Sequence, residues 1–436
     1  MAGARRRSRS PNPVLRHGFD AIRDTFGSVM IPELLHRITG MSLADGTAAD
    51  ITVENGIVTA VDPAGAPGDL HLPGWLLLSA ATEPHAHLDK ALSWSRVQQA
   101  YGDLQTAIDS WLAYAVTMTG KEVYTRSGRA LEHYLAHGIT TIRTHADVLP
   151  GEEPLRGVAA LLRLRDEVRD LMDVQVVLLT REDSPDSVVA DAVALGVDVL
   201  GGCPHLCPDP TAETRRLLDL AERFGLPLDL HTDEQLGADV LSIRELCRQV
   251  RARGLQQRVT ASHCVSLGSL EPELLAEVIA EVRAAGLGIV SLPITNLYLQ
   301  GRDHSWSRPR GIPALRALLD AGIDVAAGGD NLRDPFNPMG RADPFETTSL
   351  LVTAGHLDEA SALAAVTAGG RTVLGLPPSG PAVGSVANFV AVRADSLADV
   401  LAGPGDARVV IHGGRLVSRT VVDRKTALSA FAARPL

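Results

Sequence analysis

The sequence predicts a (β/α)8 TIM barrel joined to a small β-sandwich, and three observations lead to this α/β fold class. Eight short apolar runs in the 436-residue chain alternate with helical patterns such as TAETRRLLDLAERFG, which is typical of a parallel barrel. The runs end in polar residues suited to metal or proton chemistry, and such barrels carry their chemistry at the carboxyl ends of the strands. Short apolar runs with turn signals flank this region at both ends.

The flanks set the expected domain boundaries. Residues 1–30, with the basic stretch RRRSRSPNP, are expected to form a short disordered tail, and a nucleic-acid-binding arm is the less favoured alternative. Residues 31–80 and 375–436 are expected to pair in one β-sandwich, because chain termini often lie close together. Residues 81–374 then form a metal-dependent barrel, and a chain with 45% hydrophobic residues can bury both cores.

Each barrel strand is expected at one apolar run, and a residue of chemical interest lies at its end. In chain order, the runs are WLLLSAATEP before His85 and His87, GITTIRTHAD with His145, VQVVLLTRED with Arg181, VDVLGGCPH with His205, LPLDLHTDE with His231 and Glu234, RVTASHC with His263, GLGIVSLPITN with Asn296, and IDVAAGGDN with Asp330. We expect these side chains at one rim of the barrel.

Composition limits the partners of the chain. A net charge of −11 argues against a general binder of nucleic acid or of a membrane surface. No run of about 20 apolar residues indicates a membrane span. The four cysteines lack zinc-ribbon spacing and no secretory apolar segment precedes them, so a reduced, cytoplasmic setting is expected.

The stretch from Glu83 to Lys90, EPHAHLDK, is the most specific signal. His85 and His87 are two positions apart at an expected strand end, so both imidazoles can face one metal ion. An isolated His-x-His is weak evidence, and the later strand ends of the same type strengthen it.

Seven segments together resemble the amidohydrolase superfamily and, within it, the cytosine deaminase branch. They are EPHAHLD, IRTHAD, Pro204-His205, HTDE, VTASH, LQGR at residues 299–302 and GGDNLRDPFNPMG, and they occur in family order over residues 81–345. The ending His-Leu-Asp-Lys also resembles amidohydrolases of hydroxylated s-triazines in that branch.

The resemblance implies one divalent ion, Zn²⁺ or Fe²⁺, held by His85, His87, His231 and Asp330. Such an ion lowers the pKa of its bound water to about 7, and the hydroxide attacks the amidine-like carbon of the substrate. His263 would direct this hydroxide. Asp330 would take a proton from the water. Taken singly, Asp330 could instead cap a turn.

Glu234 follows His231 by three residues, and the resemblance makes it the proton shuttle of the reaction. A surface position is the alternative reading of this residue taken alone. Binuclear relatives bridge their ions with a lysine after the fourth strand, whereas the lysines here are Lys90, Lys121 and Lys425. One ion is therefore expected.

Departures from the branch pattern bear on the substrate. Arg181 stands where cytosine deaminases have a glutamine, and Asn331 replaces a second aspartate, so cytosine itself is disfavoured. Arg181 and Lys90 suggest a substrate with an oxygen-rich or anionic edge, and pairing of both with nearby acids is an equal alternative. The further substrate-binding candidates are His145, His205 and Phe336, and Asn296 and Gln300 are expected to line the pocket.

The sequence thus predicts a mononuclear metal-dependent aminohydrolase of a small nitrogen heterocycle. One alternative is hydrolysis of a cyclic amide or an N-alkyl C–N bond, without release of ammonia. A non-catalytic heterocycle-binding protein is a less favoured alternative, and a homo-oligomer is compatible with the sequence.

Overall fold

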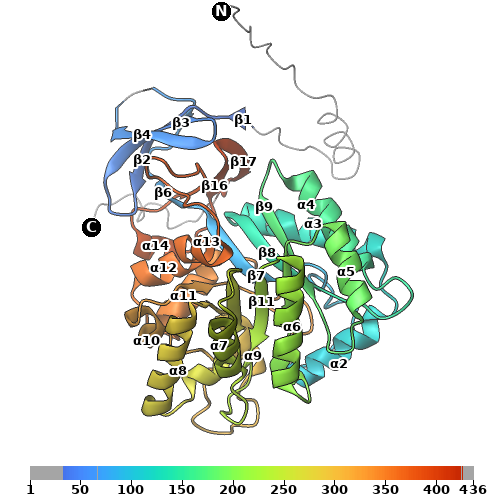
Figure 1. Cartoon of the computed structure of the whole chain (residues 1–436). Coiled ribbons are helices and arrows are strands. Elements are labelled where there is room, and N and C mark those ends of the chain that lie inside the picture. Colours follow the sequence, from blue (N-terminus) through green and yellow to red (C-terminus); the bar gives the residue numbers. More distant parts are fainter. Residues whose placement is uncertain (1–32, 66, 424, 426–436) are drawn as a thin grey trace, which may run out of the picture.

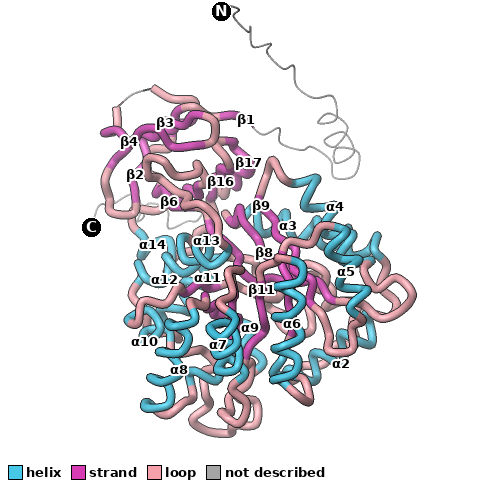
Figure 2. Tube along the Cα trace, in the orientation of Figure 1, coloured by secondary structure: helices cyan, strands magenta, loops and turns pink. Residues whose placement is uncertain are grey.

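The computed structural model describes residues 33–65, 67–423 and 425. The expected tail at residues 1–30 lies outside this part of the chain. Two sheets organise the structure, one at the centre of a ring of helices and one built from both flanks (Figures 1 and 2).

The central sheet has eight parallel strands in chain order, which confirms the predicted barrel. Its strands are β7 (Ala81–Ala86), β8 (Ile139–Asp147), β9 (Asp173–Leu179), β10 (Val199–Gly202), β11 (Leu228–Thr232), β12 (Val259–His263), β13 (Gly288–Ser291) and β14 (Val325–Ala327). Almost every residue in these strands is buried, as expected when helices cover a parallel sheet.

The seam between β14 and β7 closes the barrel with few contacts. The only bridge between the two strand ends in the described chain joins Ala86 to Asp330. The buried Glu83 carboxylate adds a link, because it accepts a hydrogen bond from the Gly329 backbone at 2.8 Å. A Cβ on Gly328 would collide with this carboxylate, so the seam requires a glycine there.

Helices surround the barrel and supply the outer half of its core. They are α2 (Leu104–Ala115), α3 (Gly120–Ala136), α4 (Arg156–Val168), α5 (Asp186–Leu195), α6 (Pro210–Phe224), α7 (Ser242–Arg253), α8 (Pro272–Ala285), α9 (Pro293–Leu299), α10 (Leu315–Asp320), α11 (Pro344–Thr353), α12 (Glu359–Val366) and α13 (Ala368–Leu374). Helix α6 is representative. Asp209 caps its first turn, Gly225 ends it in a left-handed conformation, and Leu217 and Leu218 are fully buried.

The flanks form the second unit around a separate apolar core that includes Ile38, Ile51, Phe389 and Ile411. Its sheet runs β1-β17-β16-β15-β6-β2-β3-β4, with β5 paired to β2. The strands are β1 (Glu33–Leu34), β2 (Arg37–Leu43), β3 (Ala48–Glu54), β4 (Ile57–Pro63), β5 (Leu70–His71), β6 (Leu76–Ser79), β15 (Phe389–Val392), β16 (Arg408–His412) and β17 (Arg415–Thr420); α14 (Leu397–Ala402) follows β15.

The run WLLLSAATEP differs from its prediction as one strand. Residues Leu76–Ser79 pair with β15 in the flanking sheet, and the barrel strand begins at Ala81. The backbone changes partners at this point, since Ala80 donates to Asn388 and Ala81 donates to Gly138. Two consecutive buried strands look the same as one long apolar run in sequence.

Among the described helices, none is long and apolar enough to cross a membrane.

Candidate active site

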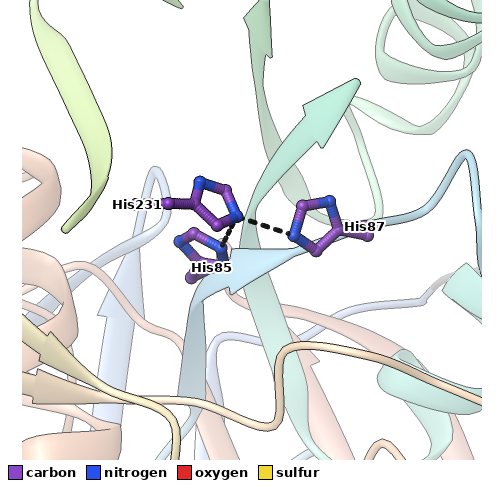
Figure 3. A group of neighbouring side chains, drawn as sticks. All are labelled: His85, His87 and His231. Atoms are coloured by element: carbon purple, nitrogen blue, oxygen red, sulfur yellow. Dashed lines mark hydrogen bonds between the residues drawn. The ribbon is translucent and has the colours of Figure 1, made fainter. Parts of the chain in front are cut away.

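Three imidazole rings converge where β7 and β11 end (Figure 3). Nε2 of His231 lies 3.1 Å from Nε2 of His85 and 3.2 Å from Nε2 of His87. All three side chains are buried, and together they form a group that could hold a metal ion.

Asp330 adds a carboxylate to this group. Its Oδ1 lies 3.4 Å from His87 Nε2 and 3.9 Å from His85 Nε2. This oxygen is buried, and no group in the described part of the chain donates a hydrogen bond to it. An unpaired carboxylate oxygen is costly to bury, so a cation is the partner that it lacks.

The separations between these atoms fit a small divalent cation. Zn²⁺ binds imidazole nitrogen at about 2.0–2.1 Å in a tetrahedral arrangement, which places neighbouring ligand atoms about 3.3–3.4 Å apart. The separations of 3.1 to 3.9 Å in the structure bracket this value. Burial also lowers the pKa of His85, His87 and His231 well below 6.5, with further lowering from nearby charges. The rings are therefore neutral, which is the form that binds metals.

The backbone takes left-handed turns at three of the strand ends. Asp233 (φ 49°), His263 (φ 70°) and Asp330 (φ 63°) all have positive φ angles. Such angles are unfavourable for residues other than glycine and are concentrated at functional sites. Two of these three residues, His263 and Asp330, present their side chains to the cavity described below.

Glu234 lies in the turn after β11, fully enclosed beside the histidine group. Asn296 Nδ2 donates a hydrogen bond to its Oε1 at 3.1 Å, and His263 Nδ1 lies 3.3 Å from the same oxygen. Burial raises the pKa of Glu234 to about 8, although the Asn296 hydrogen bond opposes this effect. A largely protonated Glu234 at neutral pH is suited to donate a proton.

His263 ends β12 beside Glu234. Its Nε2 is buried and has no hydrogen-bond partner among residues 33–65, 67–423 and 425, and burial lowers the pKa of the ring to about 3. His263 is therefore neutral, so its proton occupies either Nδ1 or Nε2.

One cavity of about 360 Å³ joins these groups. His87, His231, Glu234, His263 and Asp330 line its inner end. The volume lies at the lower end of the range of about 300–1,000 Å³ that is usual for small-molecule sites. Much of the outer wall is apolar, and its larger apolar residues are Leu104, Ile108, Trp111, Leu112, Leu149, Leu179 and Phe336.

Lys90 lines this cavity, but its charge is already paired. Its Nζ donates to Asp147 Oδ1 at 2.7 Å, and Asp147 Oδ2 accepts a hydrogen bond from Trp111 Nε1 at 2.7 Å. The nearby carboxylates of Asp147 and Asp89 raise the pKa of Lys90, against the effect of burial. Lys90 Nζ also lies 3.2 Å from His87 Nδ1, so this network joins α2 to the histidine group.

Arg181 lies at the rim of the cavity and forms an ion pair with Asp183 at 3.0 Å. Its side chain is 52% exposed. Asn331 and Phe336 line the cavity, but Asn331 Nδ2 donates to Asp334 Oδ2 at 2.9 Å. In the structure, Lys90 and Arg181 each form an ion pair with a nearby acid. This arrangement matches the alternative to a role in binding the substrate.

His145 and His205 do not line the cavity. His145 is fully buried beneath His85, with the two ring centroids 3.9 Å apart, and its Nε2 lies 3.8 Å from Asp229. His205 Nδ1 lies 3.1 Å from the His231 backbone oxygen. His145 and His205 thus pack against the histidine group from outside the cavity.

Three features of the site have a larger role than the sequence indicated. They are Asp147, which pairs with Lys90, Asn296, which contacts Glu234, and the residues of α2 that line the cavity. Asp147 ends the segment IRTHAD, and its position at a strand end was the available signal. Asn296 and Gln300 were expected to line the pocket, but both contact Glu234 instead, through its carboxylate and its backbone oxygen respectively. Trp111 could not be placed from sequence because α2 lies in a long connection.

The fold and the clustered imidazoles define a barrel hydrolase with a metal-binding site, and comparisons with known proteins agree. The sequence profile of the amidohydrolase family matches residues 109–418, and the chain belongs to this family. It is a hydrolase acting on C–N bonds, and the family implies a divalent metal at the histidine group.

Three relatives illustrate the similarity. The chain is 32% identical to a pterin deaminase of Rhizobium rhizogenes over 402 residues, which cover 88% of this chain and 91% of the relative. It is 26% identical over 388 residues to N-isopropylammelide isopropyl amidohydrolase of Pseudomonas sp., covering 84% and 90%. A crystal structure of 5-methylcytosine deaminase from Klebsiella pneumoniae superposes with a TM-score of 0.81 at 26% identity, covering 89% and 100%.

Proposed function

We propose that the protein is a mononuclear metal-dependent aminohydrolase that removes an amino group from a small nitrogen heterocycle as ammonia. The main support is the convergence of the imidazoles of His85, His87 and His231 with Asp330 in the cavity that also holds Glu234. Hydrolysis of a cyclic amidine needs three groups close together around the reacting carbon: a cation site, a proton acceptor and a proton donor.

The residues that would hold the ion are His85, His87, His231 and Asp330. A bound Zn²⁺ or Fe²⁺ would supply a water that is a good nucleophile at neutral pH. Asp330 would accept the first proton from that water, since its Oδ1 has no hydrogen-bond partner among the described residues. His263 lines the same cavity, and its Nε2, which has no hydrogen-bond partner among the described residues, would orient the attacking oxygen.

Glu234 completes the proton transfers in this proposal. As the water oxygen adds to the carbon that bears the amino group, protonated Glu234 gives its proton to the adjacent ring nitrogen. The C–N bond to the amino group then breaks: the proton held by Asp330 would pass to the departing nitrogen, which leaves as ammonia. Glu234 would take back a proton from the added hydroxyl group as the ring carbon becomes a carbonyl. In sum, the two protons of water are transferred to the ring nitrogen and to ammonia, and both carboxyl groups return to their starting states.

We infer that amino-substituted fused heterocycles of the pterin class are the substrates. The support is the 32% identity to a pterin deaminase and the apolar outer wall of the cavity, which suits the faces of a second flat ring. The paired charges of Lys90 and Arg181 give no support to a strongly anionic substrate.

The second candidate is hydrolysis of an N-alkyl C–N bond. The 26% identity to N-isopropylammelide isopropyl amidohydrolase favours it, and the apolar wall would also suit an alkyl group. The same ion and Glu234 would serve both reactions, and only the leaving group would differ.

A substrate panel separates the two candidates. Protein loaded with Zn²⁺ or Fe²⁺ is incubated with aminopterins, aminopyrimidines, aminotriazines and N-alkylaminotriazines, and ammonia and substrate loss are followed together. Ammonia in proportion to substrate loss supports deamination. Loss of an N-alkyl substrate with release of an alkylamine supports the second candidate. The cytoplasmic location stays a prediction, and a homo-oligomer stays compatible with the sequence.

A further inference from the structure

Asn296 joins the two groups that surround the reacting centre, although it does not itself line the cavity. It is fully buried in α9, which follows strand β13. Its Nδ2 lies 3.1 Å from Glu234 Oε1 and 3.1 Å from His263 Nδ1. We propose that Asn296 is a positioning residue that holds Glu234 and His263 together and keeps the proton of His263 on Nε2.

The Asn296 amide has one donor for each of the two contacts. An amide nitrogen carries two N–H groups, and it accepts no hydrogen bond. One N–H of Asn296 is used by the Glu234 carboxylate, and the other points to His263 Nδ1. A donor facing Nδ1 requires a lone pair there, so the proton of the neutral ring must be on Nε2.

The reversed orientation of the amide is unfavourable both when Glu234 is ionised and when it carries its proton on Oε2, the oxygen that exchanges protons with the substrate. It would place Asn296 Oδ1 against Glu234 Oε1, so that two acceptors would face each other. It would also free His263 Nδ1 to donate to Glu234, which lies 3.3 Å away, and would leave Nε2 without a proton. The amide thus selects between two forms of His263 with opposite hydrogen-bonding ability in the cavity.

The same contact sets the position of Glu234. The hydrogen bond from Asn296 occupies Oε1 and leaves Oε2 for proton exchange with the substrate. Gln300, just past the end of α9, donates to the Glu234 backbone oxygen at 2.8 Å, so the same segment also fixes the main chain. A rigid shell of this kind keeps catalytic groups in their working geometry.

This inference rests on the proposed function only for its effect on turnover. In a deaminase, the loss of Asn296 would weaken proton transfer by Glu234 and orientation of water by His263, with little effect on substrate binding. The selection of the His263 tautomer can be measured without any substrate, so it can be tested separately.

The test compares two Asn296 variants and one control variant with the wild type, all loaded with Zn²⁺. Asn296→Ala removes the amide, and Asn296→Asp keeps its shape but removes both N–H donors. Asn388→Ala is the matched control, because Asn388 is equally buried but lies by the flanking sheet, where its Oδ1 accepts from Gly413. Metal content, thermal unfolding, kcat and KM are measured, together with ¹⁵N NMR shifts of His263, assigned with His263→Gln.

We expect wild-type His263 to give the shifts of the Nε2–H form, and both Asn296 variants to lose them. In both variants kcat should fall by about 10- to 100-fold with KM and metal content little changed, as is usual for groups that support catalytic residues. Asn388→Ala should lower thermal stability but leave the NMR shifts and kcat unchanged. An Nδ1–H form in the wild-type protein, or full kcat in Asn296→Asp, would overturn the inference. If no panel compound is hydrolysed, the proposed function fails and the NMR result still decides the role of Asn296.

Discussion

The Lys90 ammonium group lies 2.7 Å from the Asp147 carboxylate, inside the cavity that holds the histidine group. Both side chains are largely buried, with 5% and 17% of their surfaces exposed. The charge of Lys90 therefore stabilises the site, and little of it is left to attract a substrate. Arg181 is different, since its ion pair with Asp183 is exposed to solvent.

This difference predicts a large effect for one substitution by an uncharged residue and a small effect for another. Lys90→Met leaves Asp147 without its cation, and breaking a buried pair in this way should lower the free energy of unfolding by about 3–5 kcal/mol. Arg181→Gln is the control and should change it by less than about 0.5 kcal/mol, with KM also little changed. Urea unfolding and steady-state kinetics measure both. A large rise in KM for Arg181→Gln would restore a role for this residue in substrate binding.

Glu234→Gln should abolish most of the turnover without loss of metal. The amide keeps the size of the side chain but cannot give up a proton, and general acid catalysis contributes about 10²- to 10⁴-fold. We expect kcat to fall by that factor while metal content, measured by elemental analysis, stays the same. Glu346→Gln, which changes a half-buried carboxylate on α11, is the control and should keep its activity. Retained turnover in Glu234→Gln would remove Glu234 from the mechanism.

Activity should decline as the pH rises through about 8. Burial raises the pKa of Glu234 to about 8, and the protonated form is the one that donates to the ring nitrogen. Below this value Glu234 carries its proton, and above it the donor is lost. A pH profile of kcat measures this alkaline limb. If the limb stays in place when Glu234 is replaced by aspartate, another group controls it.

Removal of the metal should destabilise the protein as well as inactivate it. An ion that binds only the folded chain adds about 2.7 kcal/mol at a concentration 100 times its dissociation constant. We expect chelation to lower the thermal unfolding temperature, and Zn²⁺ or Fe²⁺ to restore it. His231→Ala should show neither metal binding nor this shift, whereas His36→Ala, an exposed histidine of the flanking unit, should behave as the wild type. If chelation left the thermal unfolding temperature unchanged, this result would argue against a resident ion.

The barrel could be predicted because its signals are local. Strand ends such as His85, His231 and His263 follow apolar runs, and a parallel barrel brings all such ends to one rim. Partner choice between strands is not local, so the division of WLLLSAATEP between two sheets was missed. Both halves of that run are apolar and buried, and only the pairing of β6 with β15, more than 300 residues later, separates them.

The convergence of imidazoles also followed from the sequence, whereas the roles of neighbouring side chains did not. Asn296 contacts Glu234 from α9 and Trp111 contacts Asp147 from α2. These contacts depend on how a helix in a connection packs over the barrel, which residue spacing does not encode. The pairing of Lys90 with Asp147 has the same origin, because it joins the end of β8 to the turn after β7.

Mass spectrometry in ¹⁸O-labelled water tests most directly whether water replaces an amino group of the substrate. Metal-loaded protein acting on an aminopterin should give a product that carries one ¹⁸O atom on the former amino carbon, with one ammonia for each product molecule. Glu234→Gln should give neither. A product without ¹⁸O at that carbon, or release of an alkylamine from an N-alkyl substrate with no ammonia from any amino-heterocycle, would contradict the account.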